Sequence, residues 1–131
     1  MIHAGTELRV VRPTDDLAAV RRFYVDALGL PVIAEFRDHD GFDGLIVGIS
    51  GAGYHLAFTR KHGWSAGRAA TPENLLVFRI DDTQSWQRLT ERMARFGHAP
   101  VPPHNPWWSG RGLTYEDPDG YRVVLVNAEV D

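Results

Sequence analysis

The 131-residue sequence contains no cysteine. This absence excludes disulfide bonds, thiolate nucleophiles and zinc sites with cysteine ligands, and it suits a reducing cytoplasm. No apolar stretch approaches the ~20 residues that a membrane-spanning helix needs, and the N-terminal residues lack the basic and apolar segments of a signal peptide. We therefore expect a cytoplasmic protein with no membrane partner.

Basic residues are also in short supply, since 14 lysines and arginines face 17 acidic residues and give a net charge of −3 at pH 7. Such a chain has no basic surplus with which to hold a phosphate backbone, so nucleic acid is not expected as a partner. Hydrophobic residues make up 44% of the sequence, and the length is sufficient for one domain with a sizeable core.

What the sequence does contain is an internal repeat. Two aspartate pairs, Asp15–Asp16 and Asp81–Asp82, each precede apolar residues at helical spacing, and a glycine stands where each helix should end. Asp81 follows Asp15 by 66 residues. The similar words GYHLAF and GYRVVL begin at Gly53 and Gly120, which are 67 residues apart. Landmarks at nearly one spacing indicate two copies of one structural unit.

Each copy is predicted to fold as strand, helix, strand, strand, strand, which gives an α+β protein of two tandem βαβββ modules. Within one domain of residues 1–131, module one is expected over residues 6–60, a linker over 61–72 and module two over 73–128. The helix should cover one face of each curved sheet and leave the other face as an open trough suited to a small molecule. The expected strands are 7–12, 31–37, 45–49, 54–59, 74–80, 98–102, 111–116 and 121–127, and the expected helices are 16–28 and 83–96.

The last turn and strand have the sequence EDPDGYRVVLVN, from Glu116 to Asn127. Proline and glycine in Asp117–Gly120 are typical of a tight turn. Alternation along the strand then directs Val123 and Leu125 towards the helix, and Arg122 and Val124 towards the trough. By the same alternation, the equivalent strand of the first module directs Leu56 and Phe58 to the helix, and His55 and Ala57 to the trough.

The helix word DDLAAVRRFYVDALGLPV and the terminal word EDPDGYRVVLVN resemble those of the vicinal oxygen chelate (VOC) superfamily. That superfamily includes glyoxalase I, extradiol dioxygenases, and fosfomycin and bleomycin resistance proteins. The resemblance covers nearly the whole chain and implies a cupped sheet and a homodimer, which would also cover exposed edge strands. It does not indicate one reaction, because this fold hosts many activities.

In the metal-using members, four inward-facing positions carry His, Gln or Glu. The resemblance places these positions on Arg9, Ala57 (or His55 if the register shifts), Leu75 and Val124. An arginine only donates hydrogen bonds, and the aliphatic side chains have no lone pair for a cation. We therefore expect neither a metal nor another cofactor at this centre.

Other side chains remain candidates for binding or chemistry. His55 is the best candidate for a general base, because imidazole titrates near neutral pH. Adjacent tryptophans in the segment HNPWWSGRG must pack against the core, a dimer partner or a ligand. Arg111 and Arg122 could meet an anionic group, although an ion pair within the protein would explain each of them as well. The candidate ligand-binding residues are Arg9, His55, His104, Asn105, Trp107, Trp108, Arg111 and Arg122.

Two glycine-containing words are interpreted as turns. DHDGFDG, residues 38–44, is rich in carboxylates but lacks the later glutamate of an EF-hand, so it predicts a hairpin with Asp-Gly in the turn. GISGAG, residues 48–53, has neither the lysine nor the following helix of a phosphate loop.

Three functions fit these features. The first is a metal-independent protein of the bleomycin-resistance kind that binds an organic small molecule, aromatic or cationic, in a trough lined by Trp107, Trp108 and acidic residues. The second is a VOC-type enzyme, such as a lyase, isomerase or dioxygenase, that uses His55 as a base or an unusual metal set drawn from His39, His55 and His104. The third is a structural or regulatory dimer without small-molecule chemistry.

Overall fold

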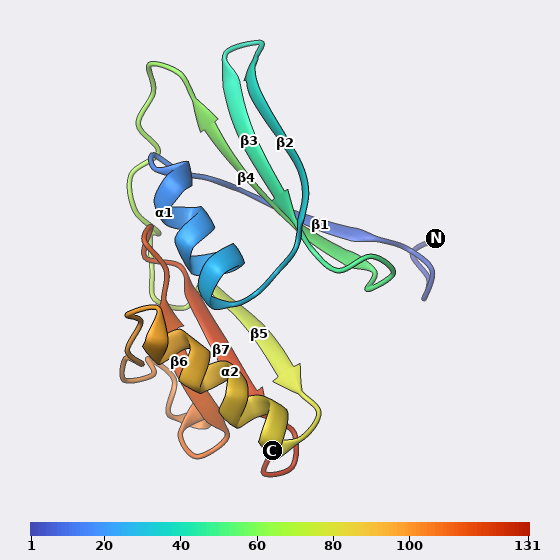
Figure 1. Ribbon diagram of the computed structural model, residues 1–131, viewed down its shortest axis with the longest axis vertical. Helices are drawn as coiled ribbons and strands as arrows, with labels where there is room; N and C mark the ends of the chain where they lie inside the picture. The colour runs from blue at the N-terminus through green and yellow to red at the C-terminus, as the bar shows by residue number, and fades with distance from the viewer. The chain divides into compact units, whose positions relative to one another are not determined.

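The structure is a computed structural model that describes all residues 1–131. The chain divides into two compact units, Met1–Gly67 and Arg68–Asp131 (Figure 1). Each unit contains one β-sheet and one principal helical segment in the order that the internal repeat predicts. The predicted class, α+β with two tandem βαβββ modules, is confirmed. No helix is both long and apolar enough to cross a bilayer.

The first unit has a four-stranded sheet in the order β1–β4–β3–β2. Strands β1 and β4 are parallel, and the other two pairs are antiparallel. The helical segment between β1 and β2 begins as an α-helix and continues as a π-helical turn, η1. The elements are β1 (Leu8–Pro13), α1 (Leu17–Arg21), η1 (Arg22–Ala27), β2 (Val32–His39), β3 (Phe42–Val47) and β4 (Tyr54–Lys61).

The helical segment made of α1 and η1 begins and ends within one residue of the predicted range, 16–28. The Asp16 carboxylate accepts a hydrogen bond from the Ala19 N–H at 3.0 Å, and Gly29 adopts φ 80°, a conformation that favours glycine. The Tyr24 ring packs on Phe58 of β4 with 4.6 Å between centroids, and both side chains are buried. Phe58 therefore faces the helix, and alternation along β4 puts His55 and Ala57 on the other face, as predicted.

The second unit has a three-stranded sheet in the order β5–β7–β6, with β5 parallel and β6 antiparallel to β7. The strand predicted over 98–102 is wrong, because only an isolated bridge between Val101 and Thr114 forms there. Prolines at 100, 102 and 103 remove the backbone donors that a strand ladder needs. The elements are β5 (Leu75–Ile80), α2 (Thr83–Arg95), η2 (Pro106–Trp108), β6 (Gly112–Glu116) and β7 (Arg122–Asn127).

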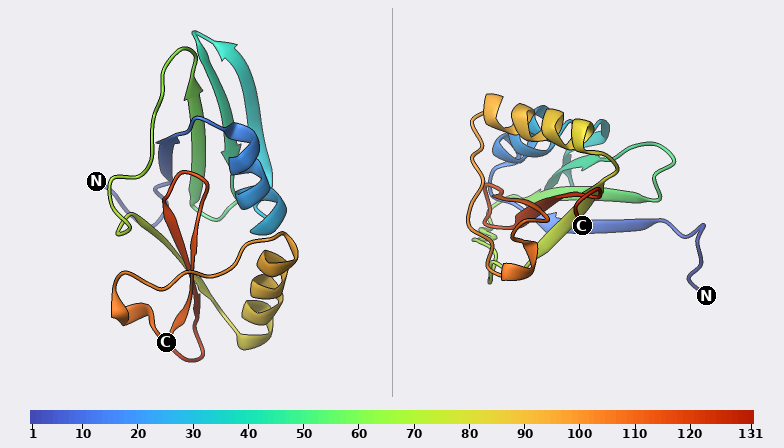
Figure 2. Two further views of the ribbon diagram at one scale, coloured as in Figure 1. Left: turned by 90° about the vertical axis from the view of Figure 1, so that its left-hand side faces the viewer. Right: turned by 90° about the horizontal axis from the view of Figure 1, so that it is seen from below.

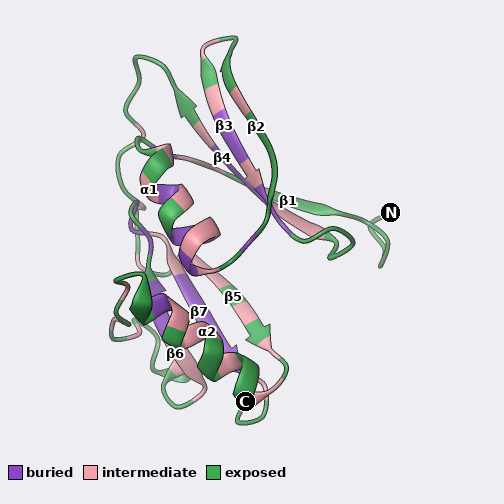
Figure 3. Ribbon diagram, in the orientation of Figure 1, coloured by how far each residue is buried: buried purple, intermediate pink, exposed green.

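Helix α2 covers one face of this sheet, and the short 3-10 helix η2 lies on the opposite side (Figure 2). The Asp82 carboxylate accepts from the Ser85 N–H at 2.8 Å and starts α2. The Trp86 indole N–H donates to the Leu125 carbonyl of β7 at 2.8 Å, which ties the helix to the sheet. In Figure 3 the central strand β7 is buried while much of α2 is exposed.

The predicted turns are present. The Asp117 carboxylate accepts from the N–H groups of Asp119 (2.8 Å) and Tyr121 (3.0 Å), so its side chain closes the turn before β7. Asp40 and Gly41 have φ values of 51° and 83°, and they form the two-residue turn between β2 and β3. These turns fix which residues of adjacent strands lie side by side.

Candidate functional site

Arg9 and His55 lie next to each other on the sheet face of the first unit that is not covered by the helix. They are in register on β1 and β4, and the next pair on this face is Val11 and Ala57. Arg9 is exposed and His55 is half-buried. Neither side chain forms an ion pair or hydrogen bond within the protein. The pair therefore offers a guanidinium and an imidazole to a bound molecule.

The absence of a side chain at Gly48 gives the His55 ring its space. A Cβ atom at position 48 would lie 3.2 Å from both the His55 ring and the Ile33 side chain. This spacing is tight, so a larger residue would displace the imidazole or the isoleucine. The GISGAG segment thus forms a turn, as predicted, and its first glycine also adjoins a candidate site residue.

The equivalent face of the second unit carries Arg122 and Val124. Arg122 is in register with Leu75 on β5 and with Glu116 on β6. Val124 is in register with Val77 and is completely buried. Leu113 and Tyr115 of β6 line a pocket together with residues of α2, and they are in register with Leu125 and Val123. Val123 and Leu125 thus face the helix as predicted, and the position equivalent to a metal-binding carboxylate is a buried aliphatic side chain on the other face.

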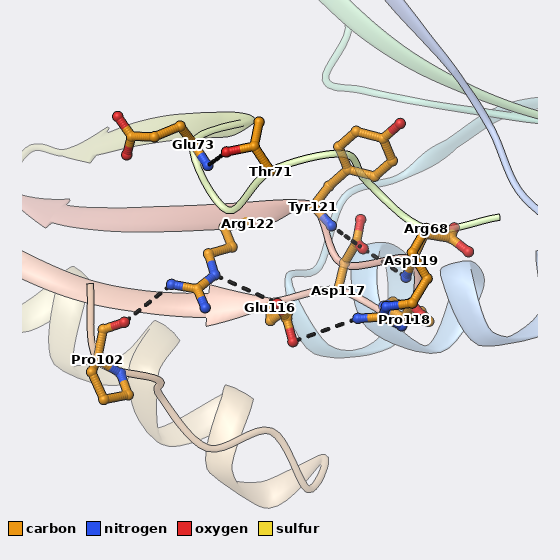
Figure 4. Close-up of polar contacts among 10 residues, drawn as sticks. All are labelled: Arg68, Thr71, Glu73, Pro102, Glu116, Asp117, Pro118, Asp119, Tyr121 and Arg122. Carbon is orange, nitrogen blue, oxygen red and sulfur yellow. Dashed lines mark hydrogen bonds and ion pairs between the residues drawn. The ribbon is translucent and has the colours of Figure 1, made fainter. Parts of the chain in front are cut away.

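Arg122 is already engaged within its own unit (Figure 4). Its Nη1 donates to the Pro102 carbonyl at 3.1 Å, and its Nε lies 3.5 Å from a Glu116 carboxylate oxygen. The other Glu116 oxygen lies 3.7 Å from Arg68 Nη2, and Arg68 Nη1 donates to the Pro118 carbonyl at 3.2 Å. These contacts connect β6, β7 and the turn between them. They favour a structural role for Arg122 over the ligand contact that the sequence also allowed.

The tryptophan segment forms a flat platform on the side of the sheet opposite α2. The Asn105 side chain accepts from the Trp107 N–H at 3.0 Å, and the Arg111 guanidinium lies 3.9 Å from the centre of the Trp107 ring. The Arg111 carbonyl accepts from the Asn127 N–H at 2.9 Å, which ties this segment to the end of β7. Trp107 is 58% exposed. It can therefore contact a bound molecule.

The other candidates in this segment differ in their surroundings. Trp108 is half-buried, and its indole N–H is buried without a hydrogen-bond partner. His104 is exposed and has no partner within the protein. Arg111 Nη1 lies 3.8 Å from the Asp131 carboxylate, which Arg79 approaches at 3.1 Å. An unpaired indole N–H is the feature here that most needs a further acceptor.

The four positions implied by the resemblance do not fit a metal ion. They carry a guanidinium at Arg9, an alkyl group at Ala57, Leu75 and Val124, and at most one imidazole if His55 is counted. His39 adjoins Phe42, which is in register with Lys61, so it lies ~20 Å along the sheet from His55. The structure contains no group of three or more His, Cys, Asp or Glu side chains arranged to hold a metal. The residues present thus give no support for a chelated cation.

A charged cluster around His62 was not singled out from the sequence. His62 Nε2 lies 2.9 Å from Asp43 Oδ1, and its Nδ1 lies 3.6 Å from Asp38. The Asp38 N–H donates to Asp43 at 2.8 Å, and this bond and the His62 contact lower the pKa of Asp43. The cluster joins the β2–β3 hairpin to the end of β4, and the signal for it was the carboxylate-rich word DHDGFDG.

Comparisons with known proteins identify the family. Residues 8–59 match the YycE-like N-terminal domain, and residues 73–127 match the YycE-like C-terminal domain. The chain is 39% identical to the Bacillus subtilis protein YycE over 125 residues, which are 95% of this chain and 90% of that protein. The crystal structure of B. subtilis YycE superimposes with a TM-score of 0.85 over 94% of this chain and 90% of that one.

Two structures from Streptomyces sp. CB03234 are also similar, each at 25% identity. A glyoxalase/bleomycin resistance protein gives a TM-score of 0.63 over 93% of this chain and 100% of that chain. TnmS3, described as an antibiotic binding protein, gives 0.65 over 97% of this chain and 98% of that chain. The internal repeat, the sheet topology and these similarities agree. The chain belongs to the YycE-like family within the vicinal oxygen chelate superfamily.

Proposed function

We propose that this protein binds an organic small molecule without a metal, on the sheet faces that the helices leave uncovered. The observation that carries this proposal is the set of side chains at the positions where metal-using relatives carry ligands. Arginine and aliphatic groups there cannot coordinate a cation. Arg9 is exposed and can meet an organic molecule through its charge, whereas Ala57 and Val124 are buried. The similarity to TnmS3, an antibiotic binding protein, also supports the proposal that this chain binds a small organic molecule.

The available side chains favour a ligand with a planar ring and a polar or anionic group. Arg9 and His55 offer unpaired donors, and the Trp107 platform offers an exposed ring backed by Arg111. Arg122 contributes less, because its Nη1 already donates to the Pro102 carbonyl and its charge is paired with Glu116. His55 is the central residue of the proposal, because it is half-buried and has no partner.

A thermal-shift screen combined with metal analysis tests this function. Aromatic antibiotics and aromatic acids form the test set, and His55→Ala and Arg9→Met are compared with the unmodified protein. A binder at 100 times its Kd should stabilise the fold by about 2.7 kcal/mol. Both variants should reduce that stabilisation, and metal content should be far below one ion per chain in all three proteins. Stoichiometric Zn, Ni, Mn or Fe that is lost in His55→Ala would contradict the proposal.

One observation favours an enzyme as the second candidate. The unpaired imidazole of His55 is free to accept a proton from a bound molecule with an acidic C–H. Mass spectrometry of each stabilising compound after incubation distinguishes the two functions. Conversion that disappears in His55→Gln would establish catalysis, whereas unchanged compound recovered with the protein supports binding alone.

We also infer that the working form is a homodimer in the cytoplasm. Strand β1 is an edge of its sheet, and its side chains Leu8 and Val11 are 61% and 58% exposed. Edge strands with exposed apolar groups are normally paired or covered. Light scattering should give twice the chain mass of 14.7 kDa at tens of micromolar. A monomer mass would contradict the dimer, and a dimer that binds nothing in the screen would favour the structural role.

A further inference from the structure

A pocket of about 360 Å³ lies on the first unit, on the same sheet face as His55 but at the other end of the strands. It is lined by Pro13, Phe42, Thr59, Lys61 and Trp64. Pro13 is in register with Thr59, and Phe42 is in register with Lys61, so these four share one face. Lys61 is six residues beyond His55 along β4, a distance of ~20 Å. The pocket is therefore separate from the Arg9–His55 pair.

Two aromatic side chains are exposed at this pocket. Phe42 is 37% exposed and Trp64 is 53% exposed. The Trp64 N–H donates to the Lys61 carbonyl at 3.3 Å, and the His62 N–H donates to the Gly41 carbonyl at 2.8 Å. These bonds connect the backbone beside Trp64 to the end of β4 and to the turn before Phe42. A planar ring would cover apolar surface that is otherwise left in water.

Lys61 supplies an uncompensated positive charge beside these rings. It is the only lysine in the chain, it forms no ion pair, and none of the residues that line the pocket is acidic. Its neighbour Arg60 behaves differently, because Arg60 Nη1 lies 3.9 Å from Asp43, on the helix-covered face. Asp43 thus pairs with Arg60 on the opposite face, and the Lys61 ammonium is left to bind an external anion.

We propose that this pocket binds a planar aromatic carboxylate, with its ring against Phe42 and Trp64 and its carboxylate on the Lys61 ammonium. The proposal does not depend on binding beside Arg9 and His55, because no residue is shared between the two places. A neutral ring lacks the charge that pairs with Lys61, and an aliphatic acid lacks the ring that packs on Phe42 and Trp64.

The single lysine makes the test direct. Reductive methylation with ¹³C-formaldehyde labels only Lys61 and the N-terminal amine, and it keeps both positive charges. Titration with 2-naphthoate should shift the Lys61 signal to saturation and leave the N-terminal signal in place. The neutral 2-naphthamide should bind about tenfold more weakly, since it cannot form a charge-assisted bond of the same strength. An unmoved Lys61 signal would overturn the proposal, even if naphthoate bound elsewhere and stabilised the fold.

Two matched substitutions test the ring contact. Trp64→Ala should weaken naphthoate binding about tenfold or more, because the largest apolar wall is removed. Phe96→Ala is the control, since Phe96 is also an exposed aromatic residue (48%) but belongs to the second unit. Equal affinity for acid and amide, or equal loss in both variants, would overturn the proposal. So would a Trp64→Ala protein that binds naphthoate normally but loses its dimer, because the pocket would then receive a second copy of the chain.

Discussion

Replacement of Arg122 by methionine tests whether this side chain holds its unit together or is reserved for a ligand. Methionine keeps an apolar stem of similar length and removes the guanidinium. The substitution breaks the hydrogen bond to the Pro102 carbonyl and the ion pair to Glu116 (Figure 4). The Arg122 side chain is only 16% exposed. Water therefore replaces its contacts poorly, and we expect the loss to appear as lower stability.

The size of the loss follows from the two contacts. Unit charges 3.5 Å apart attract by about 5 kcal/mol at an effective dielectric of 20, but Glu116 is 36% exposed and its net contribution falls to ~1 kcal/mol. The charged hydrogen bond to Pro102 adds about 1.5 kcal/mol. Arg122→Met should therefore lower the free energy of unfolding by roughly 2–3 kcal/mol. Arg68→Met should cost below ~0.5 kcal/mol, because Arg68 is 64% exposed and 3.7 Å from the carboxylate.

Urea unfolding of a double-mutant cycle measures these terms. Arg122→Met, Glu116→Gln and the double variant should give a coupling of about 1 kcal/mol, and the same cycle with Arg68 should give less than half of that. Ligand-induced stabilisation should persist in Arg122→Met. The structural role is refuted if Arg122→Met unfolds at the same urea concentration as the unmodified protein and no longer responds to a ligand that stabilises the latter.

Three further predictions concern stability. Gly112→Ala should cost more than about 2 kcal/mol in urea unfolding, because a Cβ atom there would overlap the Leu125 carbonyl of the adjacent strand. Trp86→Phe should cost about 1–2 kcal/mol by the same assay, since the Leu125 carbonyl loses its indole donor. Asp15→Asn should make the free energy of unfolding less dependent on pH in acid. The N–H groups of Ala66 and Gly67 donate to Asp15 and lower its pKa. The Asp15 carboxylate therefore stabilises the fold above about pH 4, and this stabilisation is lost as the pH falls through the folded pKa. An equal fall in stability between pH 5 and pH 2 in both proteins would contradict this assignment.

Much of the fold could be predicted because its signals are local. The caps at Asp16 and Asp82 and the turn at Asp117 depend on hydrogen bonds between residues two or three positions apart. Donor and acceptor therefore lie in the same short stretch of sequence and can be recognised from it. The strand predicted over 98–102 was wrong because its spacing fitted the repeat while its prolines did not fit a ladder. Where the repeat predicts a strand but the local residues cannot form its hydrogen bonds, the local residues determine the backbone conformation.

The candidate site was harder to predict, since it depends on which residues of different strands lie side by side. Alternation gave the faces of His55 and Arg122 correctly, but not the contact between Arg122 and Glu116, which the β6–β7 register creates. The sequence predicts a polar linker at Lys61 and Trp64, whereas β4 extends to Lys61 and places it beside Phe42. The only lysine in the sequence was a signal that could have drawn attention to this segment.

Charge is distributed unevenly between the two faces of the first sheet. On β1, β3 and β4, the face that carries His55 has Arg9 and Lys61 but no carboxylate, although the whole chain has a net charge of −3. The carboxylate of β3, Asp43, is on the other face with Arg60. A chelated cation would meet repulsion from the first face, whereas an organic anion would meet attraction that nearby acidic groups do not cancel. The absence of lone-pair donors at the four positions and the presence of Arg9 and Lys61 therefore support the same proposal, that this sheet face binds anionic organic molecules directly.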